Sequence, residues 1–371
     1  MKIGVPKEIK NNEYRVGLIP DSVAELTAKG HQLFIEKNAG AGIGFSDLDY
    51  RYAGAQIVET AGAVFAQAEM LIKVKEPQPV ECAMLRPGQI LFTYLHLAPD
   101  RQQTLNLIKS GAVCIAYETV VDNGGHLPLL IPMSEIAGRM AVQAGALALQ
   151  KNCGGAGLLL SGVPGVSPAK VMILGGGTVG SNAAQIALGV GANVFVLDKN
   201  IAVLRRLEKQ FLGRVNTVYS TKAAIVEHLG NADLVIGAVL NPGAKAPKLI
   251  SKEMLKEMKK GAAVVDVAID QGGCFATSHA TTHQQPTYLV DGIVHYCVAN
   301  MPGAVARTAA QALNNATLPY IVKLAELGYK KALLADKNLL NGLNICAGKV
   351  VLKAVAQAHD LHYMPALQLL K

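Results

Sequence analysis

The sequence lacks the features that would place it outside the globular proteins. It has no low-complexity tracts and no internal repeats. Only 17% of its 371 residues are charged and 51% are hydrophobic, so a large core can be buried and extensive disorder is excluded. A chain of this length usually forms more than one core, and we therefore expect two domains of ordinary size.

Cysteine is sparse, and its spacing is irregular. No C-x-x-C pair occurs among the six cysteines, which are Cys82, Cys114, Cys153, Cys274, Cys297 and Cys346. This pattern favours reduced, mostly buried thiols over disulfides or a zinc site. His359 and His362 form one isolated H-x-x-H pair without a thiol nearby, so we expect two surface histidines and no metal ion.

Long runs of basic charge are also missing. The formal net charge is +8, yet no basic run exceeds two residues, as at Arg205-Arg206. This dispersion indicates a solvated basic surface rather than a nucleic-acid-binding protein. Residues 171–197 carry no formal charge, but their glycines and polar residues such as Asn182 favour a soluble βαβ unit over a membrane span.

The amino terminus does not have the pattern of a signal peptide. Lys2 is followed by only a short apolar stretch before Pro6, Lys7 and Glu8. We therefore expect a cytoplasmic protein that has no membrane partner.

What the sequence does contain is a glycine-rich turn between two apolar runs. The first run begins at Lys170 and leads into Gly175-Gly-Gly-Thr-Val-Gly180. Each of three glycines has a distinct expected task that requires a missing Cβ: Gly175 turns the chain, Gly177 lets the backbone approach a pyrophosphate, and Gly180 lets the next helix pack on its strand. The spacing predicts a dinucleotide site.

The residues after this turn indicate which dinucleotide is bound. A helix that opens at about Thr178 would direct its unpaired N–H groups towards phosphates. The second apolar run, residues 193–198, ends on Asp198, where a carboxylate can meet the 2′-hydroxyl of an adenosine ribose. A carboxylate at this place favours NAD over a cofactor with a 2′-phosphate.

The pattern of apolar runs predicts an α/β fold with two Rossmann-like domains, mostly parallel sheets and a cleft between them. In the first part, strand-like runs alternate with helix-compatible segments such as 22–29, and the runs are 33–36, 70–74, 90–94 and 113–117. No glycine-rich turn follows these runs, so we assign residues 1–130 to the substrate domain.

The dinucleotide domain is expected to span residues 131–304. It begins with a helix at 135–150 that is rich in small residues, and further strands are expected at 234–240, 264–269 and 294–298. Residues 303–327 are predicted to form a long helix, followed by one or two helices around 338–344. Because so short a tail cannot bury a core of its own, we assign residues 305–371 to the substrate domain.

Several reactive side chains directly follow apolar runs. Lys75 follows 70–74, His96 follows 91–95 and Asp270 follows 264–269, while Arg15 lies in a polar loop. The carboxyl ends of strands border the ligand crevice in open α/β sheets, so these residues could share one pocket between the domains. Taken singly, each has a plainer interpretation, as a surface charge, a turn histidine or a helix cap.

Over nearly its whole length the sequence resembles the L-alanine dehydrogenase family. Seven segments carry the resemblance: 1–8, 13–17, 71–77, 94–98, 132–139, 265–273 and 298–304. The resemblance implies that Arg15 binds the substrate carboxylate and that Lys75 contacts the carbonyl oxygen of pyruvate. It also implies that His96 and Asp270 move protons, that Glu118 and Met133 lie near the substrate, and that the protein is a homohexamer.

The same resemblance implies a set of NAD-contacting residues. They are Ser134, Thr178, Val179, Asp198, Ser220, Val239, Leu240, Val267, Ala268, Ile269, Asp270, Val298, Ala299, Asn300 and Met301. Two positions depart from the family: His279 stands where arginine is common, and Val203 replaces a lysine found in some members. These departures bear on the affinity for the cofactor.

Three other functions remain open at this stage. The nucleotide-binding part of transhydrogenase is similar over most of this length, but that family has no protic pair at the places of His96 and Asp270. A dehydrogenase of the lysine or saccharopine type would share the plan and use a larger substrate. A regulatory NAD-binding protein would leave the polar residues unexplained.

Overall fold

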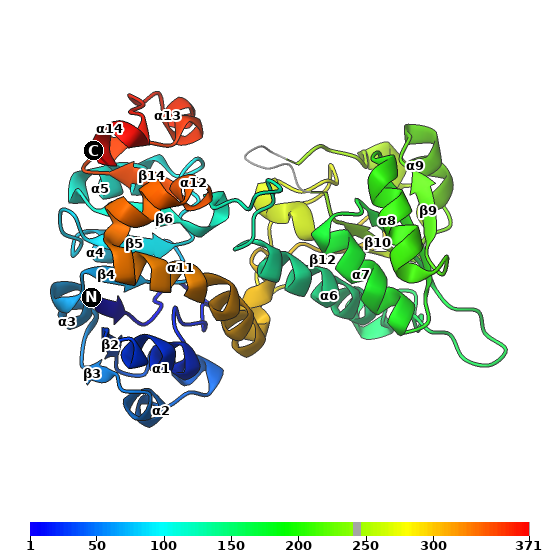
Figure 1. The fold of residues 1–371 in the computed structure, drawn as a ribbon. Coiled ribbons are helices and arrows are strands. Elements are labelled where there is room, and N and C mark those ends of the chain that lie inside the picture. Colours follow the sequence, from blue (N-terminus) through cyan, green and yellow to red (C-terminus); the bar gives the residue numbers. More distant parts are fainter. Residues whose placement is uncertain (240–245, 371) are drawn as a thin grey trace. The chain divides into compact units, whose positions relative to one another are not determined.

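The computed structural model describes residues 1–239 and 246–370, and the chain divides into two compact units (Figure 1). The first unit comprises Met1–Met133 and Val305–Lys371, and the second comprises Ser134–Ala304. Each unit is an α/β structure built on one mostly parallel sheet, which confirms the predicted α/β class with two domains and mostly parallel sheets.

The first unit contains an eight-stranded sheet in the order β15-β14-β6-β5-β4-β1-β2-β3. Its strands are β1 (Lys2–Val5), β2 (Gln32–Glu36), β3 (Gln56–Val58), β4 (Met70–Ile72), β5 (Ile90–Thr93), β6 (Val113–Ala116), β14 (Leu343–Cys346) and β15 (Lys349–Val350). The strands from β1 to β6 are parallel. Their order, in which β1 has β2 on one side and β4 on the other, is that of a doubly wound nucleotide-binding fold.

Short helices connect these strands, and local sequence explains where several of them begin and end. They are α1 (Pro20–Ala28), η1 (Ala41–Ile43), α2 (Asp47–Tyr52), α3 (Ala61–Gln67), α4 (Pro79–Cys82), α5 (Arg101–Ser110) and η2 (Tyr117–Thr119). Ser46 and Asp49 form a capping box at the start of α2. Asp100 accepts the N–H of Gln103 at the start of α5, and Gly111, with φ of 68°, ends that helix.

The carboxyl-terminal segment differs from the sequence prediction. Only a short helix, α12 (Lys337–Leu340), forms where one or two helices were expected, and the chain then adds β14 and β15 to the sheet. β14 pairs antiparallel with β6. Ala347 and Gly348, with φ of 48° and 71°, form the two-residue turn between β14 and β15, a conformation typical of a tight hairpin.

The rest of this segment is mostly helical. It contains α11 (Ala306–Ala335), α13 (Lys353–His359) and α14 (Ala366–Leu370). The predicted helix at 303–327 starts too early, because Gly303 lies in the 3-10 turn η5 (Met301–Val305). Its predicted end coincides with a kink in α11. Gly328, with φ of 71° and ψ of 157°, interrupts α11.

The second unit contains a seven-stranded sheet in the order β12-β13-β11-β10-β7-β8-β9. Its strands are β7 (Lys170–Leu174), β8 (Asn193–Asp198), β9 (Asn216–Tyr219), β10 (Leu234–Gly237), β11 (Ala263–Asp266), β12 (Thr287–Val290) and β13 (Ile293–Tyr296). β12 runs antiparallel to β13, and the other strands are parallel. Starting from β9, the parallel strands follow the Rossmann order 3-2-1-4-5-6.

Apolar residues of β7 alternate between two cores on opposite faces of this sheet. Val171 and Ile173 belong to one core, and Met172 and Leu174 belong to the other. Burial on both faces explains why the run reads as continuously hydrophobic rather than alternating.

The helices and 3-10 turns of the second unit are α6 (Ile131–Ala148, from Ser134 on), η3 (Lys151–Cys153), α7 (Thr178–Gly189), α8 (Ile201–Phe211), α9 (Lys222–Leu229), α10 (Lys252–Leu255), η4 (Val267–Gln271) and most of η5. Small residues let α6 pack closely, because a Cβ on Gly138 would lie 2.2 Å from the Val179 oxygen. Among the described residues, no helix combines the length and apolarity needed to cross a bilayer.

Candidate active site

In the first unit, the predicted substrate residues follow three adjacent strands at one edge of the sheet. Lys75 lies three residues past β4, His96 three residues past β5, and Glu118 two residues past β6. Since β4, β5 and β6 are parallel neighbours, their carboxyl ends lie at the same edge. Arg15 follows β1 at this edge through the loop that starts at Pro6.

Arg15 is buried and forms a tight pair with Glu13. Its Nε and Nη2 atoms donate to the two carboxylate oxygens of Glu13 at 2.7 and 2.6 Å, and its Nη1 lies 3.1 Å from the Met133 sulfur. Burial raises the pKa of Glu13, but the hydrogen bonds and charge of Arg15 outweigh this and leave the pKa below its usual value. The guanidinium is thereby fixed in one plane.

Lys75 lies close enough to Arg15 for the two cations to interact. Burial and then the positive charge of Arg15 lower the pKa of Lys75 below that of an ordinary lysine. In the described part of the chain, the Lys75 ammonium has no hydrogen-bond acceptor, while its carbonyl oxygen accepts from Thr93 Oγ1 at 2.9 Å. Such a cation is suited to bind a polar oxygen of a ligand.

His96 is exposed and adopts a left-handed conformation, with φ of 49°. Glu118 stabilises this turn, because its carboxylate accepts the N–H of His96 at 2.6 Å and the N–H of Leu95 at 3.2 Å. The imidazole stacks on Tyr94 with ring centroids 5.8 Å apart. A positive φ is uncommon outside glycine and often marks a functional site.

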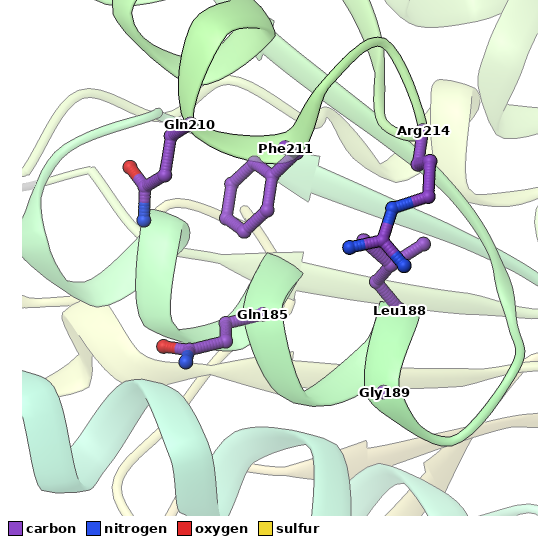
Figure 2. Close-up of a pocket in the computed structure, with 6 residues that line it drawn as sticks. All are labelled: Gln185, Leu188, Gly189, Gln210, Phe211 and Arg214. Carbon is purple, nitrogen blue, oxygen red and sulfur yellow. The ribbon is translucent and has the colours of Figure 1, made fainter.

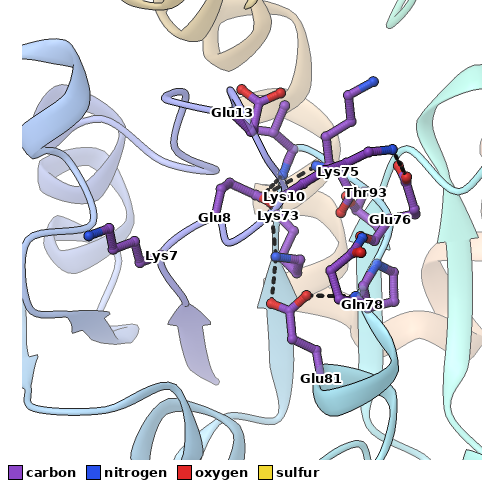
Figure 3. Close-up of polar contacts among 12 residues, drawn as sticks. Lys7, Glu8, Lys10, Glu13, Lys73, Lys75, Glu76, Gln78, Glu81 and Thr93 are labelled. Carbon is purple, nitrogen blue, oxygen red and sulfur yellow. Dashed lines mark hydrogen bonds and ion pairs between the residues drawn. The ribbon is translucent and has the colours of Figure 1, made fainter.

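A buried ionic cluster adjoins Lys75, and no sequence motif indicated it. The Lys73 ammonium lies 3.0 Å from Glu8 Oε2 and 2.7 Å from Glu81 Oε1, and Lys73 is fully buried (Figure 3). Lys10 and Glu76 form a further ion pair nearby. Residues 8 and 73 are far apart in sequence, so only the pairing of β1 with β4 brings them together.

In the second unit, the glycine turn has the geometry that dinucleotide binding requires. Gly175 has φ of 97°, and a Cβ on Gly180 would lie 1.8 Å from the Gly175 oxygen. Gly177 is different: its φ is −67°, and a Cβ there would meet no atom within 4 Å. The protein itself therefore does not require glycine at position 177, whereas a phosphate seated against the backbone would.

α7 begins at Thr178 and β8 ends at Asp198, as the sequence predicted. Asp198 contacts the turn directly, because its Oδ2 accepts the Gly176 N–H at 2.7 Å and its Oδ1 accepts the Asn200 N–H at 2.7 Å. Arg206 of α8 donates to the Gly176 oxygen at 2.7 Å. The Gly176 backbone is thus held by a carboxylate on one side and a guanidinium on the other.

The other residues expected at the cofactor site also follow parallel strands. Ser220 comes after β9, Val239 after β10, Val267 to Asp270 after β11, and Val298 to Met301 after β13. Ser134 is the exception and lies on α6, and Leu240 is outside the described residues. The side chains of Ser220, Ala268, Ile269, Val298 and Met301 are buried, so these residues would present mainly backbone to a ligand.

Asp270 does not directly follow a strand, because the predicted strand at 264–269 is confirmed only at residues 264–266. β11 ends at Asp266, and Asp270 is exposed in the 3-10 turn η4. The sequence did not point to Asp266, which is buried and accepts the N–H groups of Cys274 and Phe275 at 2.9 and 3.3 Å. Burial raises the pKa of Asp266 above its usual value. The Asp266 carboxyl group thus connects the two ends of the loop that contains Asp270.

Of the two positions that depart from the family pattern, His279 is exposed and Val203 is partly buried. His279 stacks on Tyr288 with ring centroids 3.7 Å apart, and Tyr288 stacks on His295. Val203 packs beside the glycine turn, because a Cβ on Gly176 would lie 2.7 Å from its Cγ1.

A separate small cavity of about 230 Å³ lies between the carboxyl ends of α7 and α8 (Figure 2). It is lined by Gln185, Leu188, Gly189, Gln210, Phe211 and Arg214. These residues are at the opposite end of α7 from the glycine turn, and none of them was predicted to be functional.

The cysteines are free thiols, and all but Cys153 are buried. Within residues 1–239 and 246–370, no group of three or more His, Cys, Asp or Glu side chains is arranged to hold a metal ion. The expectation of two surface histidines is wrong for His359, which is buried with its Nε2 2.8 Å from the Leu97 oxygen.

Comparisons with known proteins place the chain in a family. Residues 4–137 match the N-terminal domain and residues 141–353 the C-terminal domain of the family described as alanine dehydrogenase/PNT. An alanine dehydrogenase of Halomonas elongata is 57% identical, and the match covers 100% of both chains.

Solved structures agree with this result. One L-alanine dehydrogenase has a TM-score of 0.94 and 54% identity, with 97% of this chain and 99% of the other covered. A transhydrogenase from Sinorhizobium meliloti shares the fold, with a TM-score of 0.80 and 24% identity over 95% of this chain and all of the other. The resemblance seen in the sequence motifs is confirmed: the chain belongs to the alanine dehydrogenase/PNT family and is a nicotinamide-dependent amino acid dehydrogenase.

Proposed function

We propose that the protein catalyses the NAD-dependent oxidative deamination of L-alanine to pyruvate and ammonium, and the reverse reductive amination. The observation that best supports this proposal is the presence of two buried or partly buried cations at one sheet edge, namely Arg15 held by Glu13 and Lys75 with its lowered pKa. The 57% identity to an alanine dehydrogenase over the whole chain supports the choice of alanine.

NAD, when bound, accepts the hydride from the substrate carbon. The residues that would hold it fit a dinucleotide, because Gly177 leaves open space beside the backbone and Asp198 lies at the end of β8. The N–H groups at the start of α7 would contact the pyrophosphate, and the Asp198 carboxylate would contact the ribose. The other proposed contacts are Ser134, Gly175, Val179, Gly180, Ser220, Val239, Leu240, Val267 to Asp270 and Val298 to Met301.

Arg15 and Lys75 would bind and orient the substrate. A planar guanidinium matches a carboxylate with two parallel hydrogen bonds, and its pairing with Glu13 fixes that plane before the substrate arrives. The Lys75 ammonium would stabilise negative charge on the carbonyl oxygen of pyruvate. Met133 and Glu118 would lie near the substrate, and Glu118 would also maintain the turn at His96.

His96 and Asp270 would move protons as the carbinolamine and the imine form and collapse. An imidazole exchanges protons near neutral pH, and a solvent-accessible carboxylate can pass them on. Both side chains are exposed in their respective units, so a substrate can reach them. We further propose a cytoplasmic homohexamer, as the family resemblance implies.

The first test is to follow NADH absorbance with the purified protein, NAD and L-alanine. The reverse mixture of pyruvate, ammonium and NADH and a panel of other amino acids serve as controls. Alanine-dependent turnover supports the proposal. Tight NAD binding without turnover on any amino acid would instead favour a transhydrogenase-type module, and turnover on lysine alone would keep the chemistry and replace the substrate.

A further inference from the structure

The buried cluster of Lys73, Glu8 and Glu81 takes no part in the mechanism above. Lys73 has no exposed surface, and Glu8 and Glu81 are also buried. Burial of three ionised groups is unfavourable, and apolar residues of similar volume often give equal or better stability. The cluster therefore calls for an explanation other than stability of the fold.

The two carboxylates share Lys73 but differ in what else they bind. Glu81 uses its second oxygen to accept the Gln78 N–H at 2.8 Å, at the start of α4. Glu8 uses its second oxygen to accept the Val74 N–H at 2.6 Å and the Lys75 N–H at 3.3 Å. Of these two carboxylates, Glu8 is therefore the one that contacts the backbone of Lys75.

Glu8 also lies on the segment that leads to Arg15. This segment follows β1, and β1 pairs with β4, the strand before Lys75, in the register Ile3 to Met70. Figure 3 shows Glu8 between this loop and the end of β4, with Lys73 directed towards Glu81 and Lys75 directed away from it. The Glu8 carboxylate thus joins the two chain segments that contain Arg15 and Lys75.

We propose that Glu8 is a positioning residue, which uses its hydrogen bonds to Lys73 and to the backbone of residues 74 and 75 to hold the Lys75 ammonium beside Arg15. This assignment rests on the substrate-binding role proposed for Lys75. Glu81 forms the second ion pair with Lys73 but makes no hydrogen bond to the backbone of Lys75. It is therefore a suitable control for Glu8.

The test compares Glu8→Met with Glu81→Met. Each variant leaves Lys73 paired with one remaining carboxylate, so the loss of charge is matched. In Glu8→Met, the KM for pyruvate should rise or kcat/KM should fall about tenfold to a hundredfold, because a misplacement of about 1 Å has effects of that size. In Glu81→Met these constants should stay within about threefold of the wild type, and NADH binding should be unchanged in both variants.

A second measurement does not depend on turnover. The pH dependence of Lys75 labelling by trace acetic anhydride, read by peptide mass spectrometry, gives the apparent pKa of its amine. Glu8→Met should shift this value upwards towards that of an ordinary lysine, because Lys75 leaves its buried place beside Arg15, and Glu81→Met should not. If either Met variant does not fold, Glu8→Leu and Glu81→Leu replace the pair, with the same expected order, because leucine also lacks an acceptor for the backbone N–H groups.

Equal labelling curves and equal kinetic constants in the two variants would overturn the proposal. An upward shift confined to the Glu8 variants, in a protein without alanine turnover, would support the positioning of Lys75 and refute the proposed function instead.

Discussion

At the carboxyl edge of the first unit's sheet, the strands are followed by charged side chains, whereas at the same edge of the second unit they are followed by glycine and backbone N–H groups. Both sheets have their first strand between their second and fourth parallel strands. The first unit buries Arg15, Glu13 and Lys73 at this edge, and the second exposes Gly177. One strand order thus supports two kinds of chemistry, and the residues after the strands decide which.

The largest expected effect concerns the protic residues. His96→Ala or Asp270→Ala should lower kcat about 10²- to 10⁴-fold, because each removes a group proposed to move protons. The NADH dissociation constant, measured by fluorescence titration, should stay nearly unchanged. His126→Ala is the matched control, since His126 is an exposed histidine of the same unit that pairs with Asp122. Normal turnover in both active-site variants would contradict the mechanism.

The next comparison is between two glycines of the second unit. Gly180→Ala places a Cβ against the Gly175 oxygen and should destabilise the protein by about 1–3 kcal/mol or more. Gly177→Ala meets no protein atom, so its melting temperature should equal that of the wild type, while NADH binding weakens about tenfold. Gly189→Ala, which also meets no atom, should alter neither property. Unimpaired NADH binding by Gly177→Ala would argue against a pyrophosphate at that glycine.

Two variants of Asp198 separate its proposed role in cofactor selection from its role in supporting the glycine turn. Asp198→Ala should reduce the preference for NAD over NADP about tenfold, as the ratio of kcat/KM values, because the carboxylate no longer repels a 2′-phosphate. It also removes the acceptor for the Gly176 N–H, which Asp198→Asn retains. If both variants discriminate against NADP as strongly as the wild type, Asp198 is not the selector.

The smallest expected effect concerns the pH dependence of the free energy of unfolding. The pKa of Glu13 is lowered, so its contribution to stability is present above pH about 4.5 and is lost as the pH falls through the folded-state pKa. The pKa of Asp266 is raised, so its contribution is present below pH about 3.8 and is lost as the pH rises through the folded-state pKa.

Amide variants should therefore change the pH dependence in opposite directions. In urea titrations between pH 3 and 7, Glu13→Gln should remove a gain of stability as the pH rises towards about 4.5, and Asp266→Asn should remove a loss of stability as the pH rises above about 3.8. Each change amounts to at most about 1.4 kcal/mol for each unit by which the pKa is shifted. Parallel pH profiles for the two variants would refute these assignments.

The second unit was the easier one to predict from sequence. The turn from Gly175 to Gly180, the start of α7 at Thr178 and the end of β8 at Asp198 were all foreseen, because glycine geometry and helix starts are set by local sequence. The strand predicted at 264–269 extended three residues too far, because an apolar 3-10 turn and a buried strand can have the same composition.

The first unit was harder because its important contacts are distant in sequence. Lys75 and His96 were predicted from their places after apolar runs. No pattern near Lys73 in the sequence predicts its ion pair with Glu8, which is 65 residues away. The hairpin of β14 and β15 was missed for a similar reason, since its pairing with β6 is set by tertiary contact. Whether Arg15, Lys75, His96 and Asp270 act on one substrate stays a prediction.

The return of the chain to the first sheet has a consequence for the order of events during synthesis. Residues 134–304 form one uninterrupted unit, so this part can fold as soon as it has left the ribosome. The amino-terminal part was made earlier, but its sheet lacks β14 and β15 until residue 350 has emerged. The segment synthesised first is therefore completed last, and during that interval the edge of β6 is open to pairing with another chain.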